Sequence, residues 1–298
     1  MDFLTLIQQF INGISLGSMY ALIAIGYTMV YGVLRLINFA HADIMMVGAF
    51  SAFFAASTFE LSFSVSILFA IATSVIIGIL TDKIAYKPLR NSPRISLLIT
   101  AIGVSFFLEN IVNVTFGGTP KSFTAPEFFD QTFTIGTAIL TPTVIIVPVI
   151  TMILLAILLF ILFKTKYGVA IRALAFDVKT VSLMGVDSNK IIMLVFIIGS
   201  ALAAISGIFW AISYPILTPY MGVMIGLKAF AAAVLGGIGS VSGAVLGGFI
   251  LGFTEVMFVA LFPEMGGYKD AIAFIFLIFV LLFKPTGIMG INFEKSRF

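Results

Sequence analysis

Long apolar segments separated by short polar connections are the feature of this sequence that most restricts its fold. Hydrophobic residues make up 61% of the 298-residue chain and charged residues only 10%, with a mean hydropathy of +1.20. A soluble domain carries about 25% charged residues. Apolar stretches of this length span a bilayer as α-helices, because a helix satisfies its own backbone polar groups in lipid. The sequence therefore predicts an all-α, polytopic membrane protein whose single domain covers residues 1–298.

We expect nine membrane segments, within a range of eight to ten. Residues 222–259 are too long for one segment, and the glycine-rich run GGIGSVSG at 236–243 weakens helical structure enough to divide them. The other expected segments cover residues 10–33, 37–56, 63–80, 95–116, 144–163 and 191–213, and a final short span that ends near residue 284.

The basic residues predict the orientation of the segments. The connection at residues 82–94 contains Lys83, Lys87, Arg90 and Arg94 but only Asp82 as an acid, which is typical of a cytoplasmic loop. The connection at 117–140 has Glu127 and Asp130 against Lys121, so we place it outside. With nine segments, the N-terminus is then outside. The C-terminus, whose tail carries Lys295 and Arg297, is inside.

Residues 164–190 form the longest charged stretch, and the same parity places it in the cytoplasm. We expect one or two short amphipathic helices there, with Gly185 as a helix stop and Asp187 or Ser188 as the N-cap of the next segment. Such a loop is either a docking surface for a soluble partner or a connector without one. Its charged residues are Lys164, Lys166, Arg172, Asp177, Lys179, Asp187 and Lys190, and its predicted apolar side is Val169, Ala170, Ala173, Leu174 and Phe176.

Several ionisable residues lie inside apolar segments, where a charged one costs about 2.5–3.5 kcal/mol at the bilayer centre. They are Arg35, His41, Asp43, Glu109, Lys228 and Glu255. Helical spacing places Asn38 with His41 on one face, and Glu109 with Asn113 on another. Each side chain either makes an interhelical hydrogen bond or lines a transport pathway. The candidates for pathway or gate positions are Asn38, His41, Asp43, Glu109 and Asn113.

Glycines recur every four residues near the predicted break, at Gly239, Gly243 and Gly247. This spacing builds a face of small residues that lets two helix backbones approach closely in a membrane. Gly248 and Gly252 repeat it alongside. The candidates for a helix break or close packing are Gly236, Gly237, Gly239, Gly243 and Gly247.

The sequence gives little support to enzyme chemistry. The chain has no cysteine, no GxSxG or HExxH motif, and no Gly-Lys dipeptide, so it lacks a P-loop and cannot hydrolyse ATP in that manner. One histidine with scattered carboxylates does not make a metal site, and we expect no cofactor. A net charge of +3 gives no reason to expect nucleic acid as a partner.

Three stretches carry a resemblance to a known family. The run QQFINGISLGSMYALIAIGYTMVYGVLRLINFAHADIMMVGAF, the run GLKAFAAAVLGGIGSVSGAVLGGFIL and the late KPTGIMG look like LivH-type permeases of branched-chain amino-acid ABC importers. The loop sequences YGVAIRALAFD and SLMGVDSNKI resemble that family's cytoplasmic coupling segment. The family usually has glycine and glutamate after the histidine, where this chain has Ala42 and Asp43.

The resemblance implies an inner-membrane permease for leucine, isoleucine and valine. It implies a second homologous permease subunit, two separate ATPase subunits, a periplasmic substrate-binding protein and membrane lipid as partners. The alternatives are a permease for another small solute such as urea, amides or other amino acids, and a facilitator or secondary carrier that works without ATP. A membrane-embedded enzyme is a more distant alternative. The implied coupling residues are Gly168, Arg172, Ala173, Asp177 and Gly185.

Overall fold

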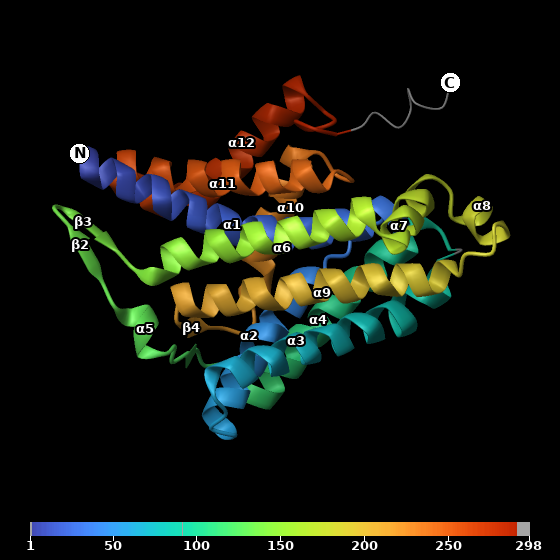
Figure 1. Ribbon diagram of the computed structural model, residues 1–298, viewed down its shortest axis with the longest axis horizontal. Helices are drawn as coiled ribbons and strands as arrows, with labels where there is room; N and C mark the ends of the chain where they lie inside the picture. Colours follow the sequence, from blue (N-terminus) through green and yellow to red (C-terminus); the bar gives the residue numbers. More distant parts are fainter. Residues whose placement is uncertain (1, 91, 291–298) are drawn as a thin grey trace.

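The computed structural model describes residues 2–90 and 92–290, and the nine predicted segments each coincide with a helix (Figure 1). Seven helical segments are long and apolar enough to cross a membrane. The other two predicted segments are α10, which is shorter, and α2, which carries His41 and Asp43 in its first turn. The basic residues Lys295 and Arg297 lie outside the described residues. The nine helices are α1 (Phe3–Leu34), α2 (His41–Thr58), α3 (Phe63–Leu80), α4 (Arg94–Phe116), α6 (Pro142–Lys164), α9 (Ser188–Ser213), α10 (Met221–Gly236), α11 (Val241–Leu261) and α12 (Lys269–Phe283).

The shorter elements gather at the two ends of the helical body (Figure 1). At one end, α7 (Lys166–Phe176) and α8 (Val178–Leu183) form the predicted loop helices, and a π-helical turn (Thr81–Tyr86) and a 3-10 turn (Lys87–Leu89) extend α3. At the other end, β2 (Phe133–Ile135) pairs antiparallel with β3 (Ala138–Leu140). The remaining elements are β1 (Lys121–Ser122), which pairs antiparallel with β4 (Ile216–Leu217), α5 (Glu127–Asp130) and a 3-10 turn (Pro263–Tyr268).

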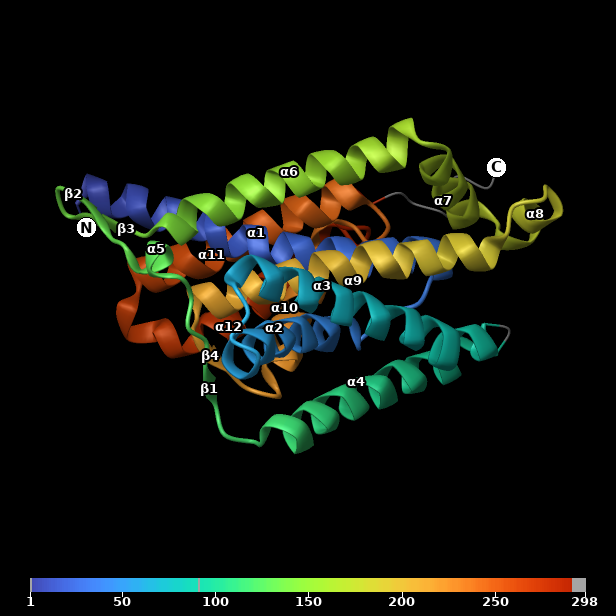
Figure 2. The same cartoon turned by 60° about the horizontal axis from the view of Figure 1, so that its bottom comes forward.

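Helix α1 is the centre of the molecule. Of its most apolar 18-residue window, 94% is buried, against 17% for α6 and 6% for the segment that contains α12. The sequences explain this difference. α1 carries small residues such as Gly13, Gly17 and Ser18, which allow neighbours to approach on every side. α6 is a nearly continuous run of large apolar side chains that suits lipid, and Figure 2 shows it at the edge of the molecule, with α4 at the opposite edge.

The order of elements repeats in the two halves of the chain. Helices α1 to α4 and α9 to α12 each comprise a long helix, a non-helical connection, a second helix and two further helices. The long helices α1 and α9 run in opposite directions (Figure 1). α1 packs against α10 and α11 of the second half, and α9 packs against α2 and α3 of the first. This exchange of contacts is typical of transporter folds built from inverted repeats.

Glycines bring α1 and α11 into backbone contact, as the predicted small-residue face requires. A Cβ atom on Gly252 would overlap the backbone of Gly17, and one on Gly248 would lie 2.6 Å from the backbone of Ala21. Across the turn between α10 and α11, Gly243 meets Gly236 in the same way. Packing in a membrane depends on such close approach, because lipid provides no hydrophobic force between helices.

The prediction that Gly239 belongs to this helical face is wrong. α10 ends at Gly236 and α11 begins at Val241, so Gly239 lies in the turn between them. Gly237 and Gly239 have φ values of +112° and +95°, which residues with a Cβ atom rarely adopt. The four-residue spacing therefore marks helix packing only from Gly243, and Gly247, which faces Ala232 of α10, continues it.

The prediction that Asn38 and His41 share a helix face is also wrong. Arg35, with a φ of +53°, ends α1, and residues 35–40 are not helical. Asn38 lies in the turn before α2, where its backbone carbonyl accepts a hydrogen bond from the His41 N–H at 3.0 Å. The apolar residues of this connection resemble the start of a helix in sequence, which is why the spacing misleads.

We expect Gly252→Ala to lower the thermal unfolding temperature of the purified protein in detergent. The added methyl group overlaps the Gly17 backbone, and overpacking of this kind costs about 1–3 kcal/mol. The matched control is Gly103→Ala on α4, because a Cβ atom there meets nothing within 4 Å. Equal unfolding temperatures for the two variants would contradict the packing role of Gly252.

Candidate functional site

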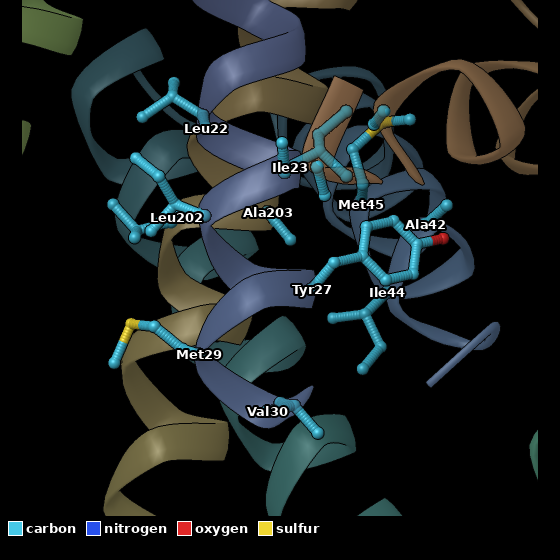
Figure 3. Packing of buried hydrophobic residues seen from close by; sticks show 14 of the residues in the cluster. Leu22, Ile23, Tyr27, Met29, Val30, Ala42, Ile44, Met45, Leu202 and Ala203 are labelled. Atoms are coloured by element: carbon cyan, nitrogen blue, oxygen red, sulfur yellow. The ribbon is translucent and has the colours of Figure 1, made fainter. Parts of the chain in front are cut away.

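Helix α2 begins inside the body of the protein. The His41 ring packs edge-on against Tyr27 of α1, with 5.1 Å between ring centroids, and a Cβ atom on Gly26 would overlap the imidazole. Gly26 lies eight residues before the end of α1 at Leu34, which is about 12 Å along a helix. Figure 3 shows Tyr27 reaching toward Ala42 and Ile44 of α2. The connection after α1 therefore turns back into the helical body and places the first turn of α2 at depth.

Two buried carboxylates meet beside this first turn. Asp43 is 1% exposed, and its Oδ2 atom accepts a hydrogen bond from the Ser105 hydroxyl of α4 at 2.5 Å. Glu109 lies one turn further along α4, is 3% exposed and interacts electrostatically with Asp43. Asp43 Oδ1 and Glu109 Oε1 have no hydrogen-bond partner, and neither carboxylate has an ion pair within the described part of the chain.

The first turn of α10 closes this site from the other side. A Cβ atom on Gly222 would overlap Asp43 Oδ1, so only glycine lets α10 approach the carboxylate. Tyr220, the residue before α10, accepts a hydrogen bond at its hydroxyl from Asn113 Nδ2 of α4 at 3.2 Å. The structure thus brings together three of the five pathway candidates, Asp43, Glu109 and Asn113.

The other two pathway candidates point elsewhere. Asn38 is buried and accepts a hydrogen bond at Oδ1 from the Tyr86 hydroxyl at 2.7 Å, which ties the connection after α1 to the turn that follows α3. His41 faces α1, and its ring lies near Gly199 of α9. Both side chains belong to the packing that holds the start of α2.

A second charged cluster joins helices of the C-terminal half to α1. The Lys228 ammonium of α10 lies 2.8 Å from Glu255 Oε1 of α11 and 2.5 Å from Asp270 Oδ1 of α12. The Tyr20 hydroxyl of α1 donates to Glu255 Oε2 at 2.9 Å. Sequence analysis identified Lys228 and Glu255 as buried charges but did not pair them. The available signal was that opposite charges stand on successive membrane helices.

This cluster borders a cavity of about 810 Å³ at the end of the molecule that carries the β2–β3 hairpin. Polar side chains of α1 and the connection after α9 share its wall with apolar residues of α1 and α11. Among the lining residues are Gln9, Asn12, Leu16, Tyr214, Val256 and Lys269. The cavity could admit water and small solutes as far as the charged cluster.

The predicted loop helices have a different buried face from the one expected. α7 buries Gly168, Ile171 and Leu174, which lie three residues apart, whereas Val169 and Phe176 are 57% and 73% exposed. Apolar side chains were assigned to the buried side because apolarity and burial usually coincide. Here Gly168 packs directly on the backbone at the end of α6, and this contact sets the rotation of α7.

The remaining coupling candidates lie along α7 and the turn after α8. The Arg172 guanidinium stacks over the Phe163 ring at 5.0 Å, and Ala173 packs partly buried against the core. Asp177 accepts hydrogen bonds from Thr180 in the first turn of α8. Gly185 has a φ of +84°, as a helix stop requires.

Two further contacts fix this loop to the membrane helices. Arg35 Nη2 lies 3.4 Å from the Ala175 carbonyl, so the end of α1 touches α7. Asp187 caps α9, and the hydrogen bond from the Lys190 backbone N–H is the main cause that lowers the pKa of its carboxyl, with the Lys190 ammonium and the Asn189 N–H adding to it. The carboxylate therefore stays ionised at neutral pH, where it caps the helix.

Comparisons with known proteins agree with this architecture. A family model described as "Branched-chain amino acid transport system / permease component" matches residues 9–281, which is most of the chain. The chain belongs to this family.

Among the described residues, no group of three or more His, Cys, Asp or Glu residues could hold a metal ion.

Individual relatives of the family extend over nearly the whole chain. The branched-chain amino acid permease protein BraD of Pseudomonas aeruginosa is 41% identical over 297 residues, with 95% of each chain covered. The permease protein LivH of Escherichia coli is 41% identical over 303 residues, with 97% of each covered. A chain of the solved structure "PsaBC from Streptococcus pneumoniae in complex with Fab" has a TM-score of 0.50 at 14% identity and covers 96% of this chain and 94% of its own, a likeness of fold alone.

We expect Lys228→Met to destabilise the protein strongly, because it leaves the buried Glu255 carboxylate beside Asp270 with only the more distant Lys269 as a cation. Breaking a buried pair in this way costs about 3–5 kcal/mol. Thermal unfolding in detergent measures the loss, and Lys228→Met combined with Glu255→Gln should recover part of it. The control is Lys190→Met, which breaks an exposed pair with Asp187. The assignment fails if the double variant is less stable than Lys228→Met alone.

Proposed function

We propose that this chain is the membrane-spanning permease subunit of an ATP-driven importer for branched-chain amino acids. The observation that carries the proposal is the match of the family model to residues 9–281, together with 41% identity to permeases named for branched-chain amino acid transport. The chain has no P-loop, so the energy comes from separate ATPase subunits.

The surface of residues 164–190 suits docking of those ATPases. Phe176, Leu183 and Met184 are 73%, 88% and 78% exposed, beyond any contact with the helical body. Exposed apolar side chains rimmed by charged residues are typical of protein interaction sites. We assign this surface, with Gly168, Arg172, Ala173, Asp177 and Gly185 shaping it, to coupling. Because α7 contacts the ends of α1 and α6, a push on the loop reaches the central helix directly.

The orientation follows from this assignment. The loop of α7 and α8 is cytoplasmic, so the N-terminus of α1 and the β2–β3 hairpin lie outside, in the inner membrane of a bacterium. A periplasmic binding protein then delivers the solute to the outer end. A second, homologous permease subunit completes the passage, and the site formed by Asp43, Glu109 and Asn113 lines it, while Asn38 and His41 hold the start of α2 in place.

We expect Leu183→Glu combined with Met184→Glu to abolish ATPase association and ATP-dependent leucine uptake. The replacements put two negative charges on a surface that would be buried against the ATPase, and they disturb no internal contact because both side chains are exposed. The measurements are co-purification of the ATPases and leucine uptake into proteoliposomes that contain the binding protein, both permeases and both ATPases.

The matched control is Phe133→Glu, which places a charge on an exposed apolar residue at the opposite end of the molecule. It should leave ATPase association unchanged. The contrary result is movement of leucine down its gradient without ATPases, at the same rate in the loop variant as in the wild type. In that case the protein is a facilitator and the coupling assignment is wrong. Uptake of another small solute in place of leucine would keep the mechanism and change the substrate.

A further inference from the structure

The unpaired acids at the start of α2 differ from every other buried charge that the structure describes. Lys228 pairs with Glu255 and Asp270, Lys269 lies 3.9 Å from Glu255, and Asp82 pairs with Arg90. Asp43 and Glu109 have no cation among the described residues, although both are at least 97% buried. An ionised carboxylate within a membrane segment costs several kcal/mol unless it is paired or faces water.

Free acceptor atoms show that the arrangement is incomplete without another group. Ser105 satisfies one oxygen of Asp43, but Asp43 Oδ1 and Glu109 Oε1 accept no hydrogen bond. Asp43 Oδ1 is buried against Gly222 of α10, and the absence of a side chain at Gly222 lets the helix come close to the oxygen. Two unsatisfied acceptors on two carboxylates that interact electrostatically match a compact donor with a positive charge and several N–H groups, which is an ammonium.

The start of α10 supplies a second feature of the site. The side chains at positions 220, 223, 224 and 227 are 49%, 43%, 45% and 37% exposed and share the face of α10 that points away from Asp43. They are Tyr220, Val223, Met224 and Leu227, so α10 turns its glycine side, with Gly222 and Gly226, toward α2. The N-terminus of α10 has no side-chain cap, and its positive end favours a carboxylate.

We propose that Asp43 and Glu109 form the subsite that binds the α-ammonium group of the amino acid as it passes through the permease. The inference rests on the proposed function, since the ligand is the transported solute itself. The first turn of α10 then faces the α-carboxylate. Such a subsite checks that the solute is an α-amino acid without holding it tightly.

The test compares neutral variants of each acid in the complete transporter. Asp43→Asn and Glu109→Gln each lower leucine uptake per ATP hydrolysed by about tenfold or more, the loss of a charge-assisted hydrogen bond. Glu109→Asp keeps the charge and retains more uptake than Glu109→Gln. Complex assembly and ATP hydrolysis stimulated by the leucine-loaded binding protein stay unchanged. The control is Glu127→Gln, an exposed carboxylate of the outer connection, which keeps full uptake.

A binding measurement separates ammonium recognition from a structural role. Tritiated leucine is bound to the detergent-solubilised transporter without binding protein. Its displacement by unlabelled leucine is then compared with its displacement by the hydroxy analogue, 4-methyl-2-hydroxypentanoate. The wild type prefers leucine, and the neutral variants lose that preference because the ammonium no longer has its partner. A preference that survives in both variants overturns the proposal.

Other results identify other partners of the acid pair and equally overturn the proposal. Loss of the second permease from the complex in Glu109→Gln would mean that a cation of that subunit pairs with the acids. A sodium requirement for uptake that disappears in the variants would assign the pair to an inorganic cation. Unchanged uptake would leave the acids a structural role. If the wild-type transporter shows no ATP-dependent leucine uptake, the proposed function fails, whereas an active wild type with unaffected variants removes only the ammonium subsite.

Discussion

The backbone contact between α1 and α11 is the interaction on which the rest of the fold depends. Helices in lipid gain little from burying apolar surface, so they associate by close packing and by hydrogen bonds that cannot be made to water. Gly17 and Gly252 allow two backbones to touch. This contact brings the Tyr20 hydroxyl within 2.9 Å of Glu255, and Lys228 extends the connection to α10 and α12. One pair of glycines thus positions a charged cluster that joins four helices.

The same central helix determines where α2 begins. Gly26 leaves room for the His41 ring, and Tyr27 packs beside it, so the chain can enter the helical body before it becomes helical. A first turn at this depth exposes Asp43 toward α4. α4 makes few packing contacts with the rest of the chain, and its polar residues Ser105 and Asn113 supply hydrogen bonds to Asp43 and Tyr220 instead. Polar contacts therefore supplement the packing of Phe116 against Phe50 and Phe54 of α2 in holding α4.

Hydropathy predicted the nine segments and the loop helices because membrane insertion is a local property of each stretch. Features that depend on neighbouring helices were predicted wrongly or not at all. The start of α2 moved from residue 37 to His41, since the turn before it is as apolar as a helix. The buried face of α7 follows the contact of Gly168 with α6, not the apolarity of Val169 and Phe176. The partners of Lys228 and Glu255 were unknown because sequence spacing describes one helix at a time.

The two groups of buried charges follow opposite physical rules, and this contrast supports their different roles. A cluster that neutralises itself, such as Lys228 and Lys269 with Glu255 and Asp270, is stable in every state of the protein in which its helices stay together. A pair of ionised acids without a cation is stable only when a positive group or water reaches it. Asp43 of α2 and Glu109 of α4 lie beside the first turn of α10, so under the ammonium proposal a passing cationic group changes the stability of that junction. The solute could then favour the arrangement of helices that binds it, while the charged cluster keeps α10, α11 and α12 joined to α1.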